Sequence, residues 1–155
     1  MQTDNFTIRS ATIDDVPAIF DLILALAEFE KLSDQVTANI ATLQADLFGD
    51  KSCIEAIVAE TESDHQIVGF ALFFINYSTF LTRRGIYLED LFVRSQFRGK
   101  GIGKALLTNL KQLAQDRGYG RFEWSVLDWN EPAIAFYKSM GAEVLPDWRT
   151  CRITL

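Results

Sequence analysis

The order of periodic patterns along the sequence predicts an α/β protein in which helices cover a mixed β-sheet. Two apolar runs, Cys53–Glu60 and Ile67–Tyr77, flank the turn Glu62–His65 and predict an antiparallel hairpin. Further on, strand patterns alternate with helical patterns, which predicts strand–helix–strand crossovers and parallel pairing. The length of 155 residues suits one domain, so we expect residues 1–155 to form a single domain.

The first part of the chain predicts one strand and two helices. Phe6–Arg9 alternates between apolar and polar residues and predicts a short strand. Thr12–Asp15 resembles a capping box and predicts a helix that runs to about Lys31. We expect Thr37 to cap a second helix and Gly49 to end it.

The middle of the chain predicts a loop, a strand, a glycine-rich turn and a helix, in that order. Ser78–Gly85 is expected to be a loop that follows the hairpin. From Tyr87 the chain predicts a buried strand, then a glycine-rich turn, then an amphipathic helix that runs to Arg117 and closes at Gly118.

The last part predicts a further crossover. Phe122–Val126 reads as a strand, and Asn130 is a favourable cap for the helix that follows. Its apolar side chains are spaced for one helical face: Ala133, Phe136, Tyr137 and Met140. A final strand is expected within Val144–Leu155. The predicted order is β-α-α-β-β-β-α-β-α-β.

Composition narrows the class of protein. The net charge is −6, which argues against a general nucleic-acid binder and suits a small cationic substrate. Cys53 and Cys151 lack metal-ligand spacing and His65 is the only histidine, so we expect no metal site. Met1–Asn5 is polar and no long apolar run occurs, so we expect no signal peptide or membrane span and a cytoplasmic location.

The stretch Tyr87–Leu107 predicts a site for a phosphate-bearing ligand. A glycine-rich turn that enters a helix offers unpaired N–H groups and the positive end of the helix dipole. The P-loop pattern fails because Arg98 and Ala105 stand where it needs glycine and serine or threonine. The dinucleotide pattern fails because its third glycine would fall on Lys104 or Leu106.

A third pattern fits, and it carries a family resemblance. The run R-G-K-G-I-G-K, with Arg98, Gly101 and Gly103, resembles the Q/R-x-x-G-x-G/A signature of the GNAT superfamily of N-acetyltransferases. The blocks I-Y-L-E-D-L-F-V and V-L-D-W-N-E-P-A-I-A-F-Y-K-S-M-G-A resemble its spermidine/spermine (diamine) and thialysine acetyltransferase branch. Two shorter runs also resemble this branch, E-F-E-K (Glu28–Lys31) and D-W-R (Asp147–Arg149). The chain departs from this branch at Leu81, near a position where relatives often carry a pocket-lining aromatic residue.

The resemblance implies the GNAT fold and a site for the co-substrate acetyl-CoA. The pyrophosphate is expected on the turn residues Arg98, Gly99, Lys100, Gly101, Ile102, Gly103 and Lys104. The pantetheine arm is expected along the strand edge Leu91, Phe92 and Val93. The N–H of Leu91 or Phe92 is expected to polarise the thioester carbonyl. Asn130 is expected to bond the pantetheine amides, although it can equally be a simple helix cap.

The resemblance also implies an acid and a base. Glu89 is the candidate that accepts the proton of the amine, and Asp90, its neighbour, should point to the opposite face of the strand. An edge position or an ion pair with Arg94 is the competing interpretation of this acidic pair. Tyr137 is the candidate that protonates the leaving thiolate, whereas its position alone suits a core aromatic.

The expected substrate is the primary amine of a small cation, attacked directly in a ternary complex. Glu30 and Asp128 are candidates to bind its distal ammonium group, and Trp129 to add a cation–π contact. Ordinary surface positions are the alternative for all three. Other readings of the whole chain are an acetyl-CoA-binding regulatory module and a protein lysine acetyltransferase. The family also implies a homodimer, and the charge and the lack of a long apolar run lead us to expect no nucleic-acid or membrane partner.

Overall fold

The computed structural model describes residues 5–155 and divides the chain into two compact units, one ending at Trp124 and one spanning Ser125–Leu155. The polar start Met1–Asp4, from which we expect no signal peptide, lies outside the described residues. Within residues 5–155, no helix is long and apolar enough to cross a membrane.

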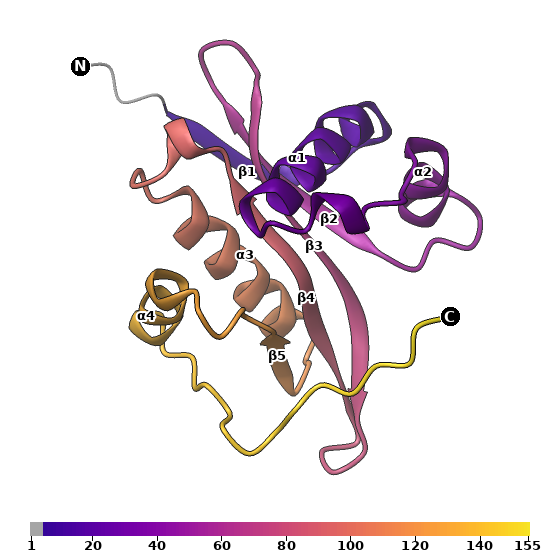
Figure 1. Ribbon diagram of the computed structural model, residues 1–155, viewed down its shortest axis with the longest axis vertical. Helices are drawn as coiled ribbons and strands as arrows, with labels where there is room; N and C mark the ends of the chain where they lie inside the picture. Colours follow the sequence, from indigo (N-terminus) through magenta and orange to yellow (C-terminus); the bar gives the residue numbers. More distant parts are fainter. Residues whose placement is uncertain (1–4) are drawn as a thin grey trace. The chain divides into compact units, whose positions relative to one another are not determined.

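The first unit is a five-stranded sheet in the order β1-β2-β3-β4-β5 (Figure 1). The strands are β1 (Phe6–Ser10), β2 (Glu55–Thr61), β3 (Ile67–Ser78), β4 (Arg83–Val93) and β5 (Arg121–Trp124). The first four pair antiparallel, and β5 pairs parallel with β4. The predicted mixed sheet and the predicted hairpin are therefore confirmed.

Helices pack on both faces of this sheet. The helices of this unit are α1 (Val16–Phe29), α2 (Ile40–Phe48) and α3 (Ile102–Asp116). Phe70 and Leu72 of β3 join the buried cluster that contains Ile19 of α1. Gly69, which points to the other face, approaches Ile102 of α3. Strand side chains alternate between faces, so α1 and α3 lie on opposite faces of the sheet.

Two details of the first unit differ from the sequence prediction. Asn39 caps α2, because its Oδ1 accepts the N–H of Thr42 at 2.9 Å, so Thr37 is not the cap. Arg83 and Arg84 belong to β4, where they stand opposite Ser78 and Tyr77, so the predicted loop is shorter than expected. The pairing of β3 with β4 extends over these two arginines because exposed strand residues tolerate charge.

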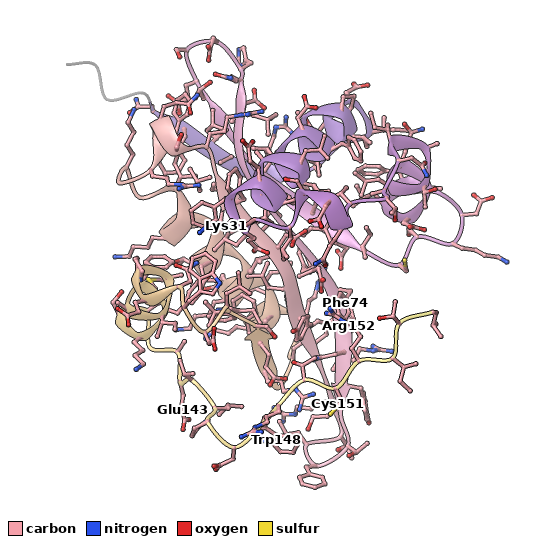
Figure 2. The ribbon with its side chains drawn as sticks, viewed as in Figure 1. Lys31, Phe74, Glu143, Trp148, Cys151 and Arg152 are labelled. Atoms are coloured by element: carbon pink, nitrogen blue, oxygen red, sulfur yellow. The ribbon has the colours of Figure 1, made fainter. Side chains whose placement is uncertain are left out.

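The second unit contains the helix α4 (Glu131–Ser139). As predicted, Asn130 caps it: its Oδ1 accepts the N–H of Ala133 at 3.3 Å. The final strand expected within Val144–Leu155 is wrong, because these residues belong to no helix or strand. A strand forms only when a neighbouring strand receives its hydrogen bonds. Figure 2 shows Trp148, Cys151 and Arg152 along this extended segment.

Candidate active site

Strands β4 and β5 pair along only the first half of β4. They pair from Gly85 opposite Arg121 to Leu88 opposite Trp124, where β5 ends. From Glu89 to Val93, β4 pairs with β3 on one side only, as far as the described residues show. The first unit therefore offers an open strand edge directly before the glycine-rich turn.

The alternation of hydrogen bonds between β3 and β4, which we call the hydrogen-bond phase, decides which peptide groups of β4 face this edge. In antiparallel pairs, residues that exchange peptide hydrogen bonds alternate with residues that exchange none. The N–H of Arg94 donates to the carbonyl of Val68 at 2.9 Å, and Phe92 stands opposite Phe70 two residues earlier. Phe92 therefore directs its peptide groups at β3, whereas Leu91 and Val93 direct theirs at the open edge. Of the two N–H groups proposed for the thioester, only that of Leu91 faces outward.

The glycine-rich turn leaves its backbone accessible. Gly99 and Gly101 have φ values of 75° and 85°, which non-glycine residues adopt only at a cost. A Cβ added at Gly99, Gly101 or Gly103 would meet no atom within 4 Å beyond the adjacent residues and, for Gly103, the backbone of its own helix. Gly103 has neither a left-handed φ nor a packing neighbour that demands glycine. The space beside it is open to a ligand that approaches the backbone.

Helix α3 begins at this turn and supplies N–H donors. Its first intrahelical bond runs from the N–H of Ala105 to the carbonyl of Gly101 at 3.0 Å. The N–H groups of Ile102, Gly103 and Lys104 therefore have no acceptor inside the helix. The side chain of Ile102 is buried, so its contribution to a ligand is its peptide group. These donors and the helix dipole suit a phosphate group.

Arg98 ties the turn to the strand and to α1. Its Nε donates to the carbonyl of Val93 at 2.8 Å, on the open edge of β4. Its guanidinium carbon lies 4.8 Å from the ring centre of Phe29 and 5.1 Å from that of Phe92. Arg98 thus closes the open edge at Val93 and holds the start of the turn against two aromatic rings. Phe29, at the end of α1, was not among the predicted site residues.

Lys100 and Lys104 add positive charge around the turn. The Nζ of Lys100 lies 5.1 Å from the ring centre of Phe97, which directs this side chain along the turn. Lys104 is exposed in the first turn of α3. A ligand that carries several phosphate charges would find both cations close to the N–H donors.

Three carboxylates gather where α1 ends and β4 opens. Leu72 and Phe73 of β3 stand opposite Asp90 and Leu88, so Glu89 is the extra residue of a β-bulge. Glu89 is exposed and Asp90 half-buried. Burial, and then the charges of Glu89 and Glu30, raise the pKa of Asp90 to about 6. Burial also raises the pKa of Glu30, which caps the C-terminal end of α1. We call Glu30, Glu89 and Asp90 the carboxylate cluster.

The arrangement of Glu89 and Asp90 differs from the one that the sequence predicted. Alternation along a regular strand would put Glu89 and Asp90 on opposite faces, but the bulge breaks the alternation at Glu89. The strongest sign of a functional carboxyl is the raised pKa of Asp90, a residue that is not among the predicted site residues. Two adjacent acids within an apolar strand were the signal that pointed to it. Among residues 5–155, no group of His, Cys, Asp and Glu side chains is arranged to hold a metal ion.

The second unit carries the remaining predicted site residues. On α4, Ala133, Phe136, Tyr137 and Met140 are all half-buried, which confirms the predicted apolar face. The rings of Phe136 and Tyr137 lie 5.5 Å apart. Asp128 and Trp129 are exposed in the loop before Asn130.

The glycine-rich turn, the parted strands and the element order together define an acyl-CoA-type transferase fold, and comparisons with known proteins agree. Residues 17–142 match the Acetyltransferase (GNAT) family model. The chain belongs to this family and is an N-acetyltransferase. GNAT acetyltransferases use acetyl-CoA as their co-substrate.

Curated relatives cover most of the chain. The thialysine N-epsilon-acetyltransferase of Sus scrofa is 40% identical over 94% of this chain and 90% of its own length. The L-ornithine N5-acetyltransferase NATA1 of Arabidopsis thaliana is 35% identical over 95% of this chain and 83% of its own length. The human spermidine/spermine N(1)-acetyltransferase-like protein 1 is 34% identical over 90% of this chain and 21% of its own length.

A solved structure shows the same fold. A metagenomic aminoglycoside acetyltransferase in complex with sisomicin matches with a TM-score of 0.80 and 21% identity, covering 97% of this chain and 96% of its own. The predicted GNAT fold is therefore confirmed, although the five-stranded sheet lacks the final predicted strand.

Proposed function

We propose that the protein transfers the acetyl group of acetyl-CoA to a primary amine of a small cationic substrate, by direct attack in a ternary complex. The observation that supports this most strongly is the open edge of β4, which lies between the glycine-rich turn and the carboxylate cluster. The two ends of this edge match the two reactants, because one end suits phosphates and the other suits cations.

The first unit offers acetyl-CoA a set of N–H donors and two cations. The pyrophosphate accepts from the N–H groups at the start of α3, beside Gly99, Gly101 and Gly103, with Lys100 and Lys104 adding charge. The pantetheine arm pairs with Leu91 and with the N–H of Val93 as an added strand, while the carbonyl of Val93 accepts from Arg98. The N–H of Leu91 donates to the thioester carbonyl and stabilises the charge that develops there. In this arrangement Arg98 supports the turn, and Asn130 bonds the arm.

The amine must lose a proton before it attacks, since a primary amine has a reference pKa of about 10.4. We propose that Glu89, exposed at the bulge, accepts this proton directly or through a water molecule. Asp90 beside it has a pKa of about 6 and is a second acceptor within the same cluster. Tyr137 donates its phenolic proton to the departing sulfur, a role that the family resemblance of its segment supports.

The substrate we propose is a diamine, a polyamine or a thialysine-like amino acid. Such molecules carry a second ammonium group, and Glu30 offers it opposite charge in a half-buried setting. Asp128 and Trp129 are proposed for the same group on the family resemblance. The names of the relatives, which include ornithine, thialysine and spermidine/spermine acetyltransferases, support this class. We also propose a homodimer, which the family resemblance implies.

Thiol release from acetyl-CoA tests this proposal. The panel contains diamines, polyamines, thialysine, ornithine and a lysine-containing peptide, each also assayed with Tyr137→Phe. We expect turnover on the small amines and little on the peptide. Turnover confined to the peptide would indicate a protein lysine acetyltransferase. CoA binding without turnover on any amine would indicate a regulatory module.

A further inference from the structure

The face of the sheet that α1 packs against continues past the carboxylate cluster. Along β3, every second side chain lies on this face, and Phe74 comes two residues after the position opposite Asp90. Tyr87 stands opposite Phe74. The bulge at Glu89 places Tyr87 there, because without the extra residue Leu88 would stand opposite Phe74. Two aromatic rings and Asp90 are therefore neighbours on one face of the sheet.

These two rings, which we call the ring pair, form one half-buried surface. The centres of the Phe74 and Tyr87 rings lie 5.1 Å apart, and their planes are inclined by 30°. Both residues are half-buried, and neither belongs to the buried cluster in which α1 covers Phe70 and Leu72. In Figure 2, Phe74 lies below α1 and α2 in the view. A ring surface at the border of the helical cover suits contact with the apolar part of a small ligand.

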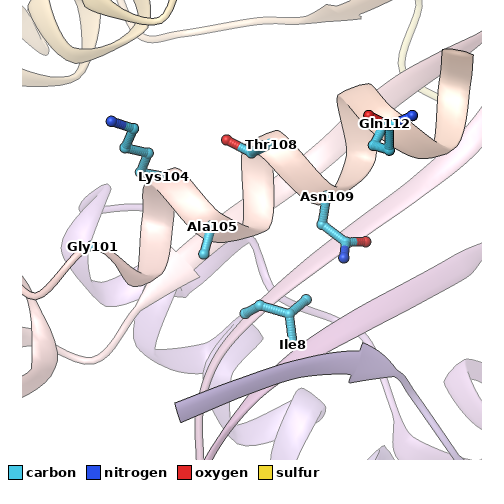
Figure 3. Close-up of a pocket in the computed structure, with 7 residues that line it drawn as sticks. All are labelled: Ile8, Gly101, Lys104, Ala105, Thr108, Asn109 and Gln112. Atoms are coloured by element: carbon cyan, nitrogen blue, oxygen red, sulfur yellow. The ribbon is translucent and has the colours of Figure 1, made fainter. Parts of the chain in front are cut away.

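The ring pair lies on the other face of the sheet from the groove beside α3. Figure 3 shows that groove, with Gly101 and Lys104 at the start of α3 and Ile8 of β1 below the helix. Gly101 and Lys104 are proposed to bind acetyl-CoA, so the groove adds no separate site. The ring pair instead adjoins the carboxylate cluster, which is proposed for the amine.

The charges beside the ring pair are already balanced. Glu123 of β5 stands opposite Tyr87, and its carboxylate pairs with Arg121 at 2.6 Å. Within residues 5–155, by contrast, Asp90 and Glu30 form no ion pair. A half-buried ammonium group needs an opposite charge, because a cation–π contact repays only part of its lost hydration. A cation is therefore favoured at the carboxylate cluster and disfavoured over the rings.

We propose that the ring pair is the apolar wall of the amine site, which packs against the uncharged carbon chain of the substrate and disfavours a further ammonium group within that chain. This inference rests on the proposed acetyl transfer and narrows its substrates. Diamines and thialysine-like amino acids fit the wall, because their chains carry no charge between the two amino groups. Spermidine and spermine, which carry inner ammonium groups, fit it less well.

The spacing along the sheet matches this division. Successive residues on one face of a strand lie about 7 Å apart, so the rings begin about that far from Asp90. The inner ammonium group of spermidine follows a terminal one after three or four carbon atoms, roughly 5–6 Å away in an extended chain. With one amino group held at the carboxylate cluster, this inner group falls over Phe74 and Tyr87. A diamine places methylene groups there instead.

Two amines of equal length test the wall in the unmodified protein. Spermidine and 1,8-diaminooctane have the same number of chain atoms between their terminal amino groups and differ by one inner ammonium group. Thiol release at saturating acetyl-CoA gives kcat/KM for each amine, and we expect 1,8-diaminooctane to be favoured about 10-fold or more. Equal values, or a preference for spermidine, would overturn the wall alone. Thiol release with neither these amines nor any other would overturn the proposed acetyl transfer, and the wall with it.

A new carboxylate in the wall should reverse this preference. Phe74→Glu puts a negative charge where the inner ammonium group falls, so the kcat/KM of spermidine relative to 1,8-diaminooctane should rise about 10-fold or more. The matched control is Ile75→Glu, which adds the same charge at an exposed position one residue along β3, on the opposite face. Its ratio should stay within about twofold of the unmodified value. Equal changes in the two variants would overturn the assigned position of the chain.

Removal of one ring tests the apolar contact without a new charge. In linear monoamines from propylamine to hexylamine, kcat/KM of the unmodified protein should rise about threefold for each methylene group, as expected for methylene burial. In Phe74→Ala the rise should be less than about 1.5-fold, whereas Ile75→Ala should keep it. The KM for acetyl-CoA should be unchanged in both variants. An equal rise in Phe74→Ala and in the unmodified protein would overturn the wall.

Discussion

At the scale of single residues, Asp90 carries the clearest electrostatic signal of the site. Its pKa of about 6 exceeds the ordinary 3.8, so the folded protein holds this proton more tightly than the unfolded chain does. The folded state therefore loses stability as the pH rises from about 4 to about 6, and that loss persists at neutral pH. An ionised carboxylate kept half-buried at such a cost is typical of a functional site.

Asp90→Asn should therefore separate stability from activity. We expect the free energy of unfolding at pH 7 to rise by about 1–2 kcal/mol, with no gain at pH 3.5, where both forms are neutral. The acidic limb of the kcat/KM profile near pH 6 should disappear, and activity should fall. Urea unfolding at the two pH values and a pH–rate profile measure both. Glu89→Gln, at an exposed position, is the control for stability. An unchanged acidic limb would leave Glu89 as the sole acceptor.

A substitution of Tyr137 tests whether its phenol is the proton donor. Tyr137→Phe keeps the ring beside Phe136 and removes the phenolic proton. We expect kcat to fall about 100-fold or more, as for loss of a general acid, while KM for acetyl-CoA changes little. Steady-state kinetics with matched circular dichroism spectra measure this. A kcat close to that of the unmodified protein would make Tyr137 a packing residue only.

At the scale of elements, the start of α3 is shaped for a ligand that contacts its backbone. Gly103→Ala adds a methyl group into open space, so CoA affinity should stay within about threefold. Gly103→Gln extends into the same space and should weaken CoA binding about 10-fold or more, equivalent to about 1.4 kcal/mol. Calorimetric titration with CoA compares them. Equal affinities in both variants would show that no phosphate lies against Gly103.

The open edge of β4 makes a second element-scale prediction. Leu91→Pro removes an N–H that faces the edge, whereas Phe92→Pro removes one that faces β3. Phe92→Pro should lower the free energy of unfolding by about 2–3 kcal/mol. Leu91→Pro should fold more stably than Phe92→Pro but lose about 100-fold in kcat, as when an oxyanion donor is removed. Urea unfolding and kinetics of both variants decide it. Comparable losses of stability would contradict the assigned hydrogen-bond phase.

Local patterns predicted much of this fold because local chemistry decided it. The cap at Asn130, the stop at Gly49 and the hairpin around Glu62–His65 follow from short-range hydrogen bonding and backbone preference. The bulge at Glu89 escaped prediction, because a bulge is a property of two paired strands and the partner register cannot be read from one of them. The contact of Arg98 with Phe29 joins residues far apart in sequence, which periodicity does not reveal.

At the scale of the whole molecule, one sheet serves two purposes. The unpaired part of β4 is the edge that we propose for the amide-bearing arm of acetyl-CoA, and the acidic pair Glu89 and Asp90 lies at the other end of that edge. The missing final strand belongs to the same scale. Thr150–Leu155 alternates like a strand, yet a strand is stable only against a neighbour. The predicted final strand is wrong because Thr150–Leu155 pairs with no strand of the described sheet.

We propose that the carboxylate cluster selects a small amine with a second positive charge. The most direct measurement is kcat/KM for 1,4-diaminobutane against butylamine, with acetyl-CoA, in the unmodified protein and in Glu30→Gln. We predict a preference for the diamine of about 30-fold or more, worth about 2 kcal/mol, which shrinks at least about fivefold in Glu30→Gln. Equal kcat/KM values for the two amines would contradict selection by the carboxylate cluster. Thiol release no faster than with Tyr137→Phe would contradict the proposed acetyl transfer.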